Sequence, residues 1–185
     1  MEKGIFKKTK GKKSANKYNY SNIVSNILIN YAAFKSGDNF QNLLDKVFIS
    51  KAKIENPAYF KVMHSKSVQG KYKVDEKNDG AIRYSFVASR YDYLRIAKAM
   101  LDDWQNDTCE GKYLKSLFER KINKNAQWEN NKDSFGLTKS YAGFFHTGLK
   151  GMKKRPIFIM DGYGGQIFTI DFEKGRIVAT MAIHR

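Results

Sequence analysis

The stretch Tyr18-Asn19-Tyr20-Ser21-Asn22 marks the point where the character of this chain changes. Residues 1–17 are polar, contain seven lysines and lack periodicity, so we expect a basic loop or loose terminus. Beyond the stretch, apolar residues recur at helical spacing, namely Ile23, Val24, Ile27, Leu28, Tyr31 and Ala32. The stretch therefore predicts the start of a folded domain covering residues 18–185.

Helix-capping residues predict where the helices begin and end. Gly37 is suited to the left-handed cap that ends the first helix. Asp38 and Gln41 form a capping-box pattern for a second helix, and Ser89 and Asp92 form one for a third. The second, third and fourth helices are predicted near residues 40–49, 89–104 and 112–121.

The last third of the chain has the pattern of β-strands. We predict strands at residues 141–147, 157–160, 166–171 and 176–183. Phe172-Glu173-Lys174-Gly175 reads as the hairpin turn between the last two strands. Because the strands are apolar on both faces, helices are expected on both sides of the sheet. Helices first and a hairpin-linked sheet last predict an α+β fold with an antiparallel sheet flanked by helices.

Composition limits the class of protein. A chain of 185 residues fits one domain, and no apolar run reaches the ~18 residues of a membrane span. Met1 is followed by lysine-rich sequence, which is not typical of a signal peptide, and the compartment stays open. The single cysteine, Cys109, excludes an internal disulfide. His64, His146 and His184 fit no zinc spacing, so we expect no metal and no cofactor.

The net charge of +16 allows two interpretations. A nucleic-acid or acidic-surface partner is the specific one, because lysines gather in residues 1–17. The general one is charge spread over solvated faces in a lysine-rich chain. Outside the first segment the basic residues are scattered, and no RNA-binding aromatic motif is present. We therefore favour the general interpretation and do not expect a nucleic-acid partner.

Taken together, these pieces resemble the serine β-lactamase and penicillin-binding-protein-like hydrolase superfamily, in particular its esterase and 6-aminohexanoate-oligomer hydrolase branch. Tyr20-Ser21-Asn22 matches the Tyr-x-Asn motif that leads into an apolar helix. Gly162-Tyr163-Gly164-Gly165-Gln166, followed by strand, hairpin and strand, matches the family's third motif. The resemblance runs from residue 18 to 183. It implies part of a β-lactamase-like sandwich without the N-terminal strands, the nucleophile helix and the closing helix.

The resemblance also implies the chemistry. Family members cleave ester or amide bonds, including β-lactams and short amide oligomers, through an acyl-enzyme. Tyr20 would be the general acid/base and Asn22 the polar orienter. Tyr163 or Gly164 would supply the oxyanion N–H, within a substrate-binding turn formed by Gly162, Tyr163, Gly164, Gly165 and Gln166. The structural alternatives are an interface tyrosine and a plain turn.

A second sequence, His146-Thr147-Gly148, is similar to the family's third motif. The nucleophile motif of the family, Ser-x-x-Lys at the start of an apolar helix, is not found. His146-Thr147-Gly148 is followed by a basic loop, so we interpret His146 as a strand-end residue. The Ser-x-x-Lys strings at Ser14 and Ser50 do not open an apolar helix, and neither is assigned as nucleophile. We expect the C-terminal part of a serine hydrolase, inactive alone. A non-catalytic ligand-binding member of the family and a basic nucleic-acid-binding protein remain as alternatives.

Overall fold

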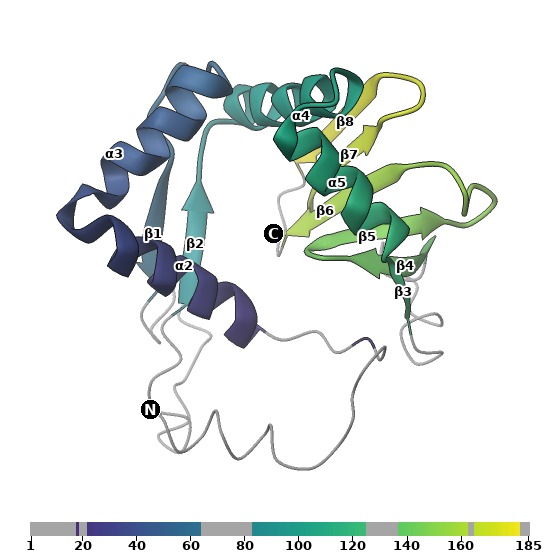
Figure 1. Ribbon diagram of the computed structural model, residues 1–185, viewed down its shortest axis with the longest axis horizontal. Helices are drawn as coiled ribbons and strands as arrows, with labels where there is room; N and C mark the ends of the chain where they lie inside the picture. Colours follow the sequence, from purple (N-terminus) through teal and green to yellow (C-terminus); the bar gives the residue numbers. More distant parts are fainter. Residues whose placement is uncertain (1–17, 19–21, 64–82, 125–136, 163–164, 182–185) are drawn as a thin grey trace, which may run out of the picture.

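The computed structural model describes residues 18, 22–63, 83–124, 137–162 and 165–181. It is a mixed helix and sheet structure with antiparallel sheets, which confirms the α+β class. Figure 1 shows two layers joined across the top by one long helix, α4 (Arg90–Gln105). The first layer holds the N-terminal helices and a β-hairpin, and the second holds a six-stranded sheet.

The first layer begins with α2 (Asn22–Ser36), which ends where Gly37 takes a positive φ of 57°. The chain continues through η1 (Gly37–Asn39), α3 (Phe40–Asp45) and the π-helical turn η2 (Lys46–Lys51). Strands β1 (Tyr59–Met63) and β2 (Arg83–Val87) pair as an antiparallel hairpin. Phe60 and Phe86 of this hairpin pack against Phe40 and Phe48, which attaches the hairpin to the helices.

The second layer is an antiparallel sheet whose strands follow one another in chain order. Its members are β3 (Ile122–Asn123), β4 (Thr138–Ala142), β5 (Phe145–Leu149), β6 (Ile157–Gly162), β7 (Gln166–Asp171) and β8 (Arg176–Met181). Helices α4 and α5 (Cys109–Glu119) cover one face. Within the described residues no helix lies against the other face (Figure 1). Helices were expected on both faces of the sheet, and the structure has them on one face only.

Helix α4 contributes to both hydrophobic cores. Ala97 and Leu101 pack into the main core beneath the sheet, together with Phe158 and Ile170. Ile96 and Ala99, on another face of α4, pack against the small core around Ile54. An interior helix with apolar residues on two faces is buried on two sides. The two layers are therefore held together through α4.

The carboxylate of Asp92 fixes the first turn of α4 to the first layer. Its side chain is fully buried. It accepts hydrogen bonds from the Glu55 backbone N–H at 2.8 Å, the Asn56 amide at 3.1 Å and the Ser89 hydroxyl at 2.7 Å. Arg95 Nη1 lies 3.2 Å away. Burial alone raises the pKa of a carboxyl, but these hydrogen bonds outweigh it and lower the Asp92 pKa from 3.8 to about 2.

Several sequence predictions are confirmed. The first helix and its Gly37 end are as expected. The Ser89 cap is confirmed, since its hydroxyl accepts the Asp92 backbone N–H at 3.1 Å. Strand β7 has the predicted bounds, and the turn over 172–175 joins it to β8.

Other predictions are wrong. Residues 141–147 are not one strand but the ends of β4 and β5, because Gly143 takes a positive φ of 64° and turns the chain. The capping box at residues 38–41 is also wrong. Asn39 occupies the cap position of α3 without a side-chain bond to the helix backbone, and Gln41 donates instead to the Ala58 carbonyl at 3.0 Å.

We predict that Asp92→Asn destabilises the fold by about 3 kcal/mol, because an amide cannot accept all of these donors and leaves buried groups unsatisfied. Chemical denaturation at neutral pH measures the change. Asp102→Asn is the matched control on the same helix. Its exposed pair with Lys98 is worth at most about 0.5 kcal/mol.

The pH dependence follows from the same carboxylate. The folded pKa of Asp92, about 2, lies below its ordinary value of 3.8, so its contribution is complete above pH 3.8 and disappears as the pH falls toward 2. The wild type should therefore lose more stability over this range than Asp92→Asn. Identical acid profiles for the two proteins would contradict this assignment.

Candidate functional site

A cleft of about 530 Å³ opens between the two layers. One wall is β2 and the residues that follow it, and the other is formed by the inner ends of β6, β7 and β8. The first turn of α4 closes the cleft through Tyr93. The hydrogen bonds of Asp92 hold this turn in place, so they also set the position of Tyr93.

Three aromatic rings form the apolar floor. Tyr93 stacks on Phe168 of β7, with ring centroids 4.7 Å apart, and meets Phe86 of β2 edge-on at 5.7 Å. The Tyr93 hydroxyl donates to the Phe86 carbonyl at 2.9 Å, which joins α4 to β2. Burial raises the pKa of Tyr93, so its hydroxyl stays protonated at neutral pH and acts as a structural donor.

The polar rim comes mostly from the wall opposite β2. Asp161, Gly162 and Gln166 lie at the point where β6 turns into β7, and Ser85 lies on β2. Gly162 is exposed, and a Cβ added there would lie 3.1 Å from Gln166 Oε1. The Gln166 amide is therefore beside the bare Gly162 backbone. An amide can both donate to and accept from a bound ligand.

The turn itself depends on glycine. The Gly165 N–H donates to the Gly162 carbonyl at 3.2 Å, which closes the chain between β6 and β7. Gly165 has a φ of +83°, a left-handed value that side chains with a Cβ rarely adopt. Glycine at these positions also lets a ligand approach the backbone closely. The turn predicted from sequence is therefore a hairpin turn at the mouth of the cleft.

Only some of the predicted site residues are placed at the cleft by the structure. Gly162 and Gln166 line the cleft, and Gly165 shapes the turn between them. Asn22 is the first residue of α2, a helix that contacts β2, although its side chain lies outside the described part of the chain. Tyr20, Tyr163 and Gly164 also lie outside the described residues.

Two other strings from the sequence analysis, His146-Thr147-Gly148 and the one that begins at Ser50, lie away from the cleft, and Ser14 lies outside the described residues. His146 is the second residue of β5 rather than a strand-end residue, so that prediction is wrong. Its burial, with the nearby Lys124 ammonium, lowers the His146 pKa from 6.5 to about 4. Thr147 donates to the Ile157 carbonyl at 2.7 Å and is fully buried. Ser50 lies in the π-helical turn η2 and is not part of the cleft lining.

The aromatic floor was missed by the sequence analysis. None of Phe86, Tyr93 and Phe168 was predicted as a site residue. The available signal was the position of Tyr93 one residue after Asp92, the capping-box partner of Ser89, because the cap fixes the first turn of the helix. No spacing rule connects that position with β2 or β7.

The described residues contain no group of histidine, cysteine, aspartate or glutamate side chains that could hold a metal ion. None of the described helices is both long and apolar enough to cross a bilayer. Comparison of the chain with protein-family models, with curated proteins and with solved structures finds no match. The chemistry of the cleft itself is therefore the basis for assigning a function.

We predict that Gly165→Ala destabilises the protein by about 1–2 kcal/mol, because an L-residue at this φ brings its Cβ too close to the backbone. Gly165→Asn should cost less, since asparagine tolerates the left-handed region. Thermal denaturation of both variants measures the difference. Gly151→Ala is the control. Gly151 has the same φ of +83° but lies in a different loop, so this variant measures the cost of backbone strain alone. An alanine variant as stable as the wild type would contradict the assigned turn.

Proposed function

We propose that this chain is the C-terminal part of a serine hydrolase that cleaves ester or amide bonds through an acyl-enzyme. The observation that carries the proposal is the glycine turn at the mouth of an aromatic-floored cleft. An apolar floor suits the acyl chain of a substrate. Backbone N–H groups at a tight turn suit the negative oxygen that forms when a carbonyl is attacked.

The roles of individual residues follow from the resemblance to the β-lactamase-related hydrolases. Tyr20 is the proposed general acid/base, and Asn22 orients the reacting groups. Tyr163 or Gly164 is the proposed N–H donor to the oxyanion. Gln166 binds the polar part of the substrate next to Gly162. The proposed architecture is part of a β-lactamase-like sandwich, and the mixed α+β class with an antiparallel sheet supports it.

Ser-x-x-Lys occurs at Ser14 and Ser50, and the sequence after neither string has the pattern of an apolar helix opened by the serine. Serine hydrolysis needs an activated nucleophile, because a free hydroxyl attacks carbonyls poorly. We therefore propose that this chain by itself binds the substrate class without turning it over. This observation also favours the second candidate function, a non-catalytic member of the family that binds ester- or amide-containing ligands.

The first test measures turnover by the purified chain. We expect no hydrolysis of p-nitrophenyl butyrate or of a chromogenic β-lactam above the buffer rate, and no change on Tyr20→Phe. Steady hydrolysis that disappears in Tyr20→Phe would show that a nucleophile is present and would overturn the inactive-alone proposal.

The second test measures binding of a short linear amide dimer by calorimetry. We expect Gln166→Ala to weaken binding by about fivefold, the loss of roughly one hydrogen bond. Gln105→Ala is the matched control, because Gln105 is an exposed glutamine at the far end of α4 and outside the cleft. Equal effects of the two substitutions, or no binding by the wild type, would contradict the proposed site.

A further inference from the structure

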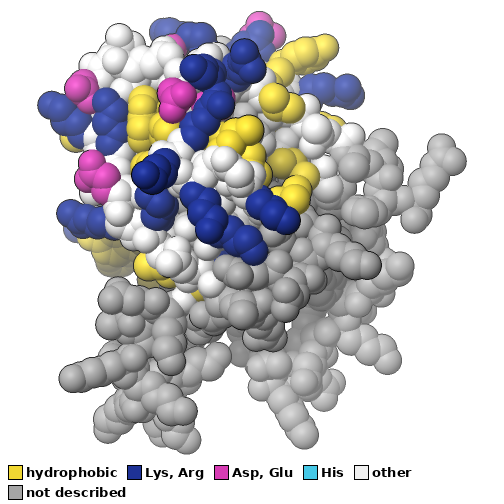
Figure 2. Space-filling model, turned by 90° about the vertical axis from the view of Figure 1, so that its right-hand side faces the viewer, with side chains coloured by type: hydrophobic (Ala, Val, Ile, Leu, Met, Phe, Trp, Pro, Cys, Tyr) yellow, Lys and Arg dark blue, Asp and Glu magenta, His cyan; other side chains and the backbone are white. Residues whose placement is uncertain are grey.

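The end of the sheet opposite the cleft is strongly basic. It is formed by the β5–β6 loop (150–156) and the β7–β8 turn (172–175), together with the adjoining strand residues 171 and 176. Residues 150–155 and 171–176 carry six basic and two acidic side chains, a net charge of +4. In Figure 2, which faces this end of the molecule, Lys and Arg side chains spread among hydrophobic ones, with fewer acidic side chains.

An internal ion pair fixes the geometry of this basic end. Arg155 Nε donates to Asp171 Oδ1 at 3.0 Å, and Arg155 Nη2 donates to Asp171 Oδ2. Asp171 also accepts the Lys174 backbone N–H at 3.2 Å, and the Phe172 N–H donates to the Pro156 carbonyl at 3.1 Å. Arg155 and Asp171 therefore neutralise each other and clamp the loop to the turn.

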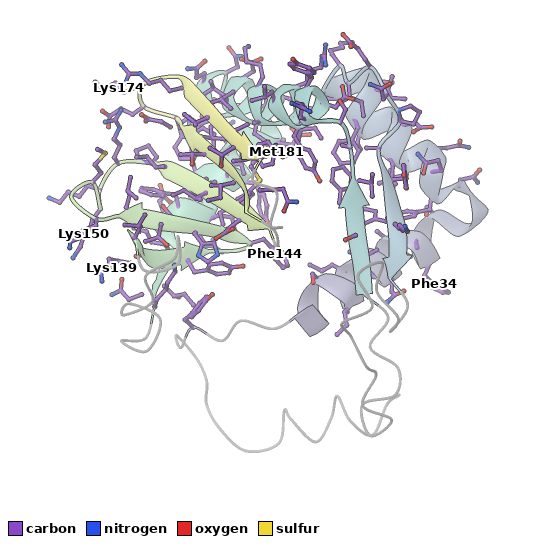
Figure 3. The ribbon with its side chains drawn as sticks, turned by 180° about the vertical axis from the view of Figure 1, so that it is seen from behind. Phe34, Lys139, Phe144, Lys150, Lys174 and Met181 are labelled. Atoms are coloured by element: carbon purple, nitrogen blue, oxygen red, sulfur yellow. The ribbon has the colours of Figure 1, made fainter. Side chains whose placement is uncertain are left out.

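Three lysines carry most of the uncompensated charge, and Arg176 carries the rest. Lys150, Lys153 and Lys154 are exposed, and no ion pair within the described residues includes them. The second acid, Glu173, lies 3.6 Å from Lys174 Nζ and 4.0 Å from Arg155 Nε. Figure 3 shows Lys150 and Lys174 pointing outward at this end, whereas Met181 lies at the inner end beside the cleft.

Exposed apolar side chains lie among these lysines. Met152 is 44% exposed at the tip of the loop, and Leu137 is 55% exposed. The Leu137 carbonyl accepts the Lys150 N–H at 2.9 Å, so the two residues are adjacent. A hollow of about 580 Å³ lies between the loop and the turn, lined by Met152, Lys153 and Glu173 among others. Exposed apolar side chains surrounded by lysines suit a partner whose surface is negatively charged and whose interior is apolar.

We propose that this basic end docks on the surface of an anionic lipid bilayer. Lys150, Lys153 and Lys154 contact the lipid phosphates, and Met152 and Leu137 enter the headgroup region. A nucleic acid fits less well, because the loop contains no aromatic residue for base stacking and Phe172 of the turn is only 3% exposed.

Docking in this way leaves the cleft accessible. Strand β6 runs from the basic end at Ile157 to the cleft at Gly162. The five residue steps from Ile157 to Gly162, at about 3.3 Å each, separate the two ends by roughly 17 Å. The basic end is a different surface from the proposed hydrolase site, and its docking does not depend on that function.

Vesicle co-sedimentation of the full chain tests the proposal, with phosphatidylcholine vesicles that contain or lack phosphatidylglycerol. We expect binding only to the anionic vesicles. Lys150→Gln/Lys153→Gln/Lys154→Gln should weaken it about 100-fold, because each lysine near an anionic surface contributes severalfold. The charge-matched control is Lys35→Gln/Lys46→Gln/Lys61→Gln, three exposed lysines of the first layer, which should change binding little.

Met152→Ser distinguishes a bilayer from a nucleic acid. It should weaken vesicle binding severalfold and leave any retention on duplex DNA unchanged, since phosphate contacts need no apolar tip. Equal losses for the two lysine triple variants, absence of vesicle binding, or binding unaffected by Met152→Ser would each overturn the proposal. Near-ultraviolet circular dichroism of each variant confirms that the fold is retained.

Discussion

The buried carboxylate of Asp92 is the interaction on which the arrangement of the two layers depends. It joins the first turn of α4 to the chain that leads from the N-terminal helices to the hairpin. An ionised group in the interior is stable only when donors surround it, and here the backbone, an amide, a hydroxyl and a guanidinium do so. With its first turn fixed, α4 packs Ala97 against the large sheet and Ala99 against the small core of the first layer.

The cleft is a consequence of that arrangement. Tyr93 follows Asp92 directly, stacks on Phe168 of the large sheet and donates to the Phe86 carbonyl of the small one. The width of the cleft is therefore determined by three side chains in contact and not by a loop. The glycine turn between β6 and β7 adds the polar edge, and the opposite ends of the same strands carry the lysine-rich loop. The two proposed functions are thus at opposite ends of one sheet.

Local signals were enough to predict much of the fold. The Gly37 helix end, the Ser89 cap and strand β7 each depend on a few neighbouring residues. The hairpin at Gly143 was hidden because apolar residues continue on both sides of the turn. The position of Gly111 could not be read from sequence either. A Cβ there would lie 1.9 Å from the Asp103 carbonyl oxygen, so the glycine allows α5 to approach α4, a contact between two elements.

For the site, sequence predicted the turn but not its surroundings. Gly162 and Gln166 reach the cleft because the local turn pattern and the strand register fix them. The aromatic floor comes from three elements distant in sequence, and no local pattern brings Phe86, Tyr93 and Phe168 together. The lysines of the β5–β6 loop looked scattered because the Arg155–Asp171 clamp, which directs them to one end, spans 16 residues.

The central claim is that the cleft between β2 and the glycine turn binds the ester- or amide-containing ligand. A crystal structure of the chain soaked with a short acyl amide tests it most directly. We expect electron density for the acyl chain against Tyr93 and Phe168, with the carbonyl oxygen toward the turn at Gly162. Density for the amide at another surface, or in the cleft with its carbonyl directed away from the turn, would contradict the account.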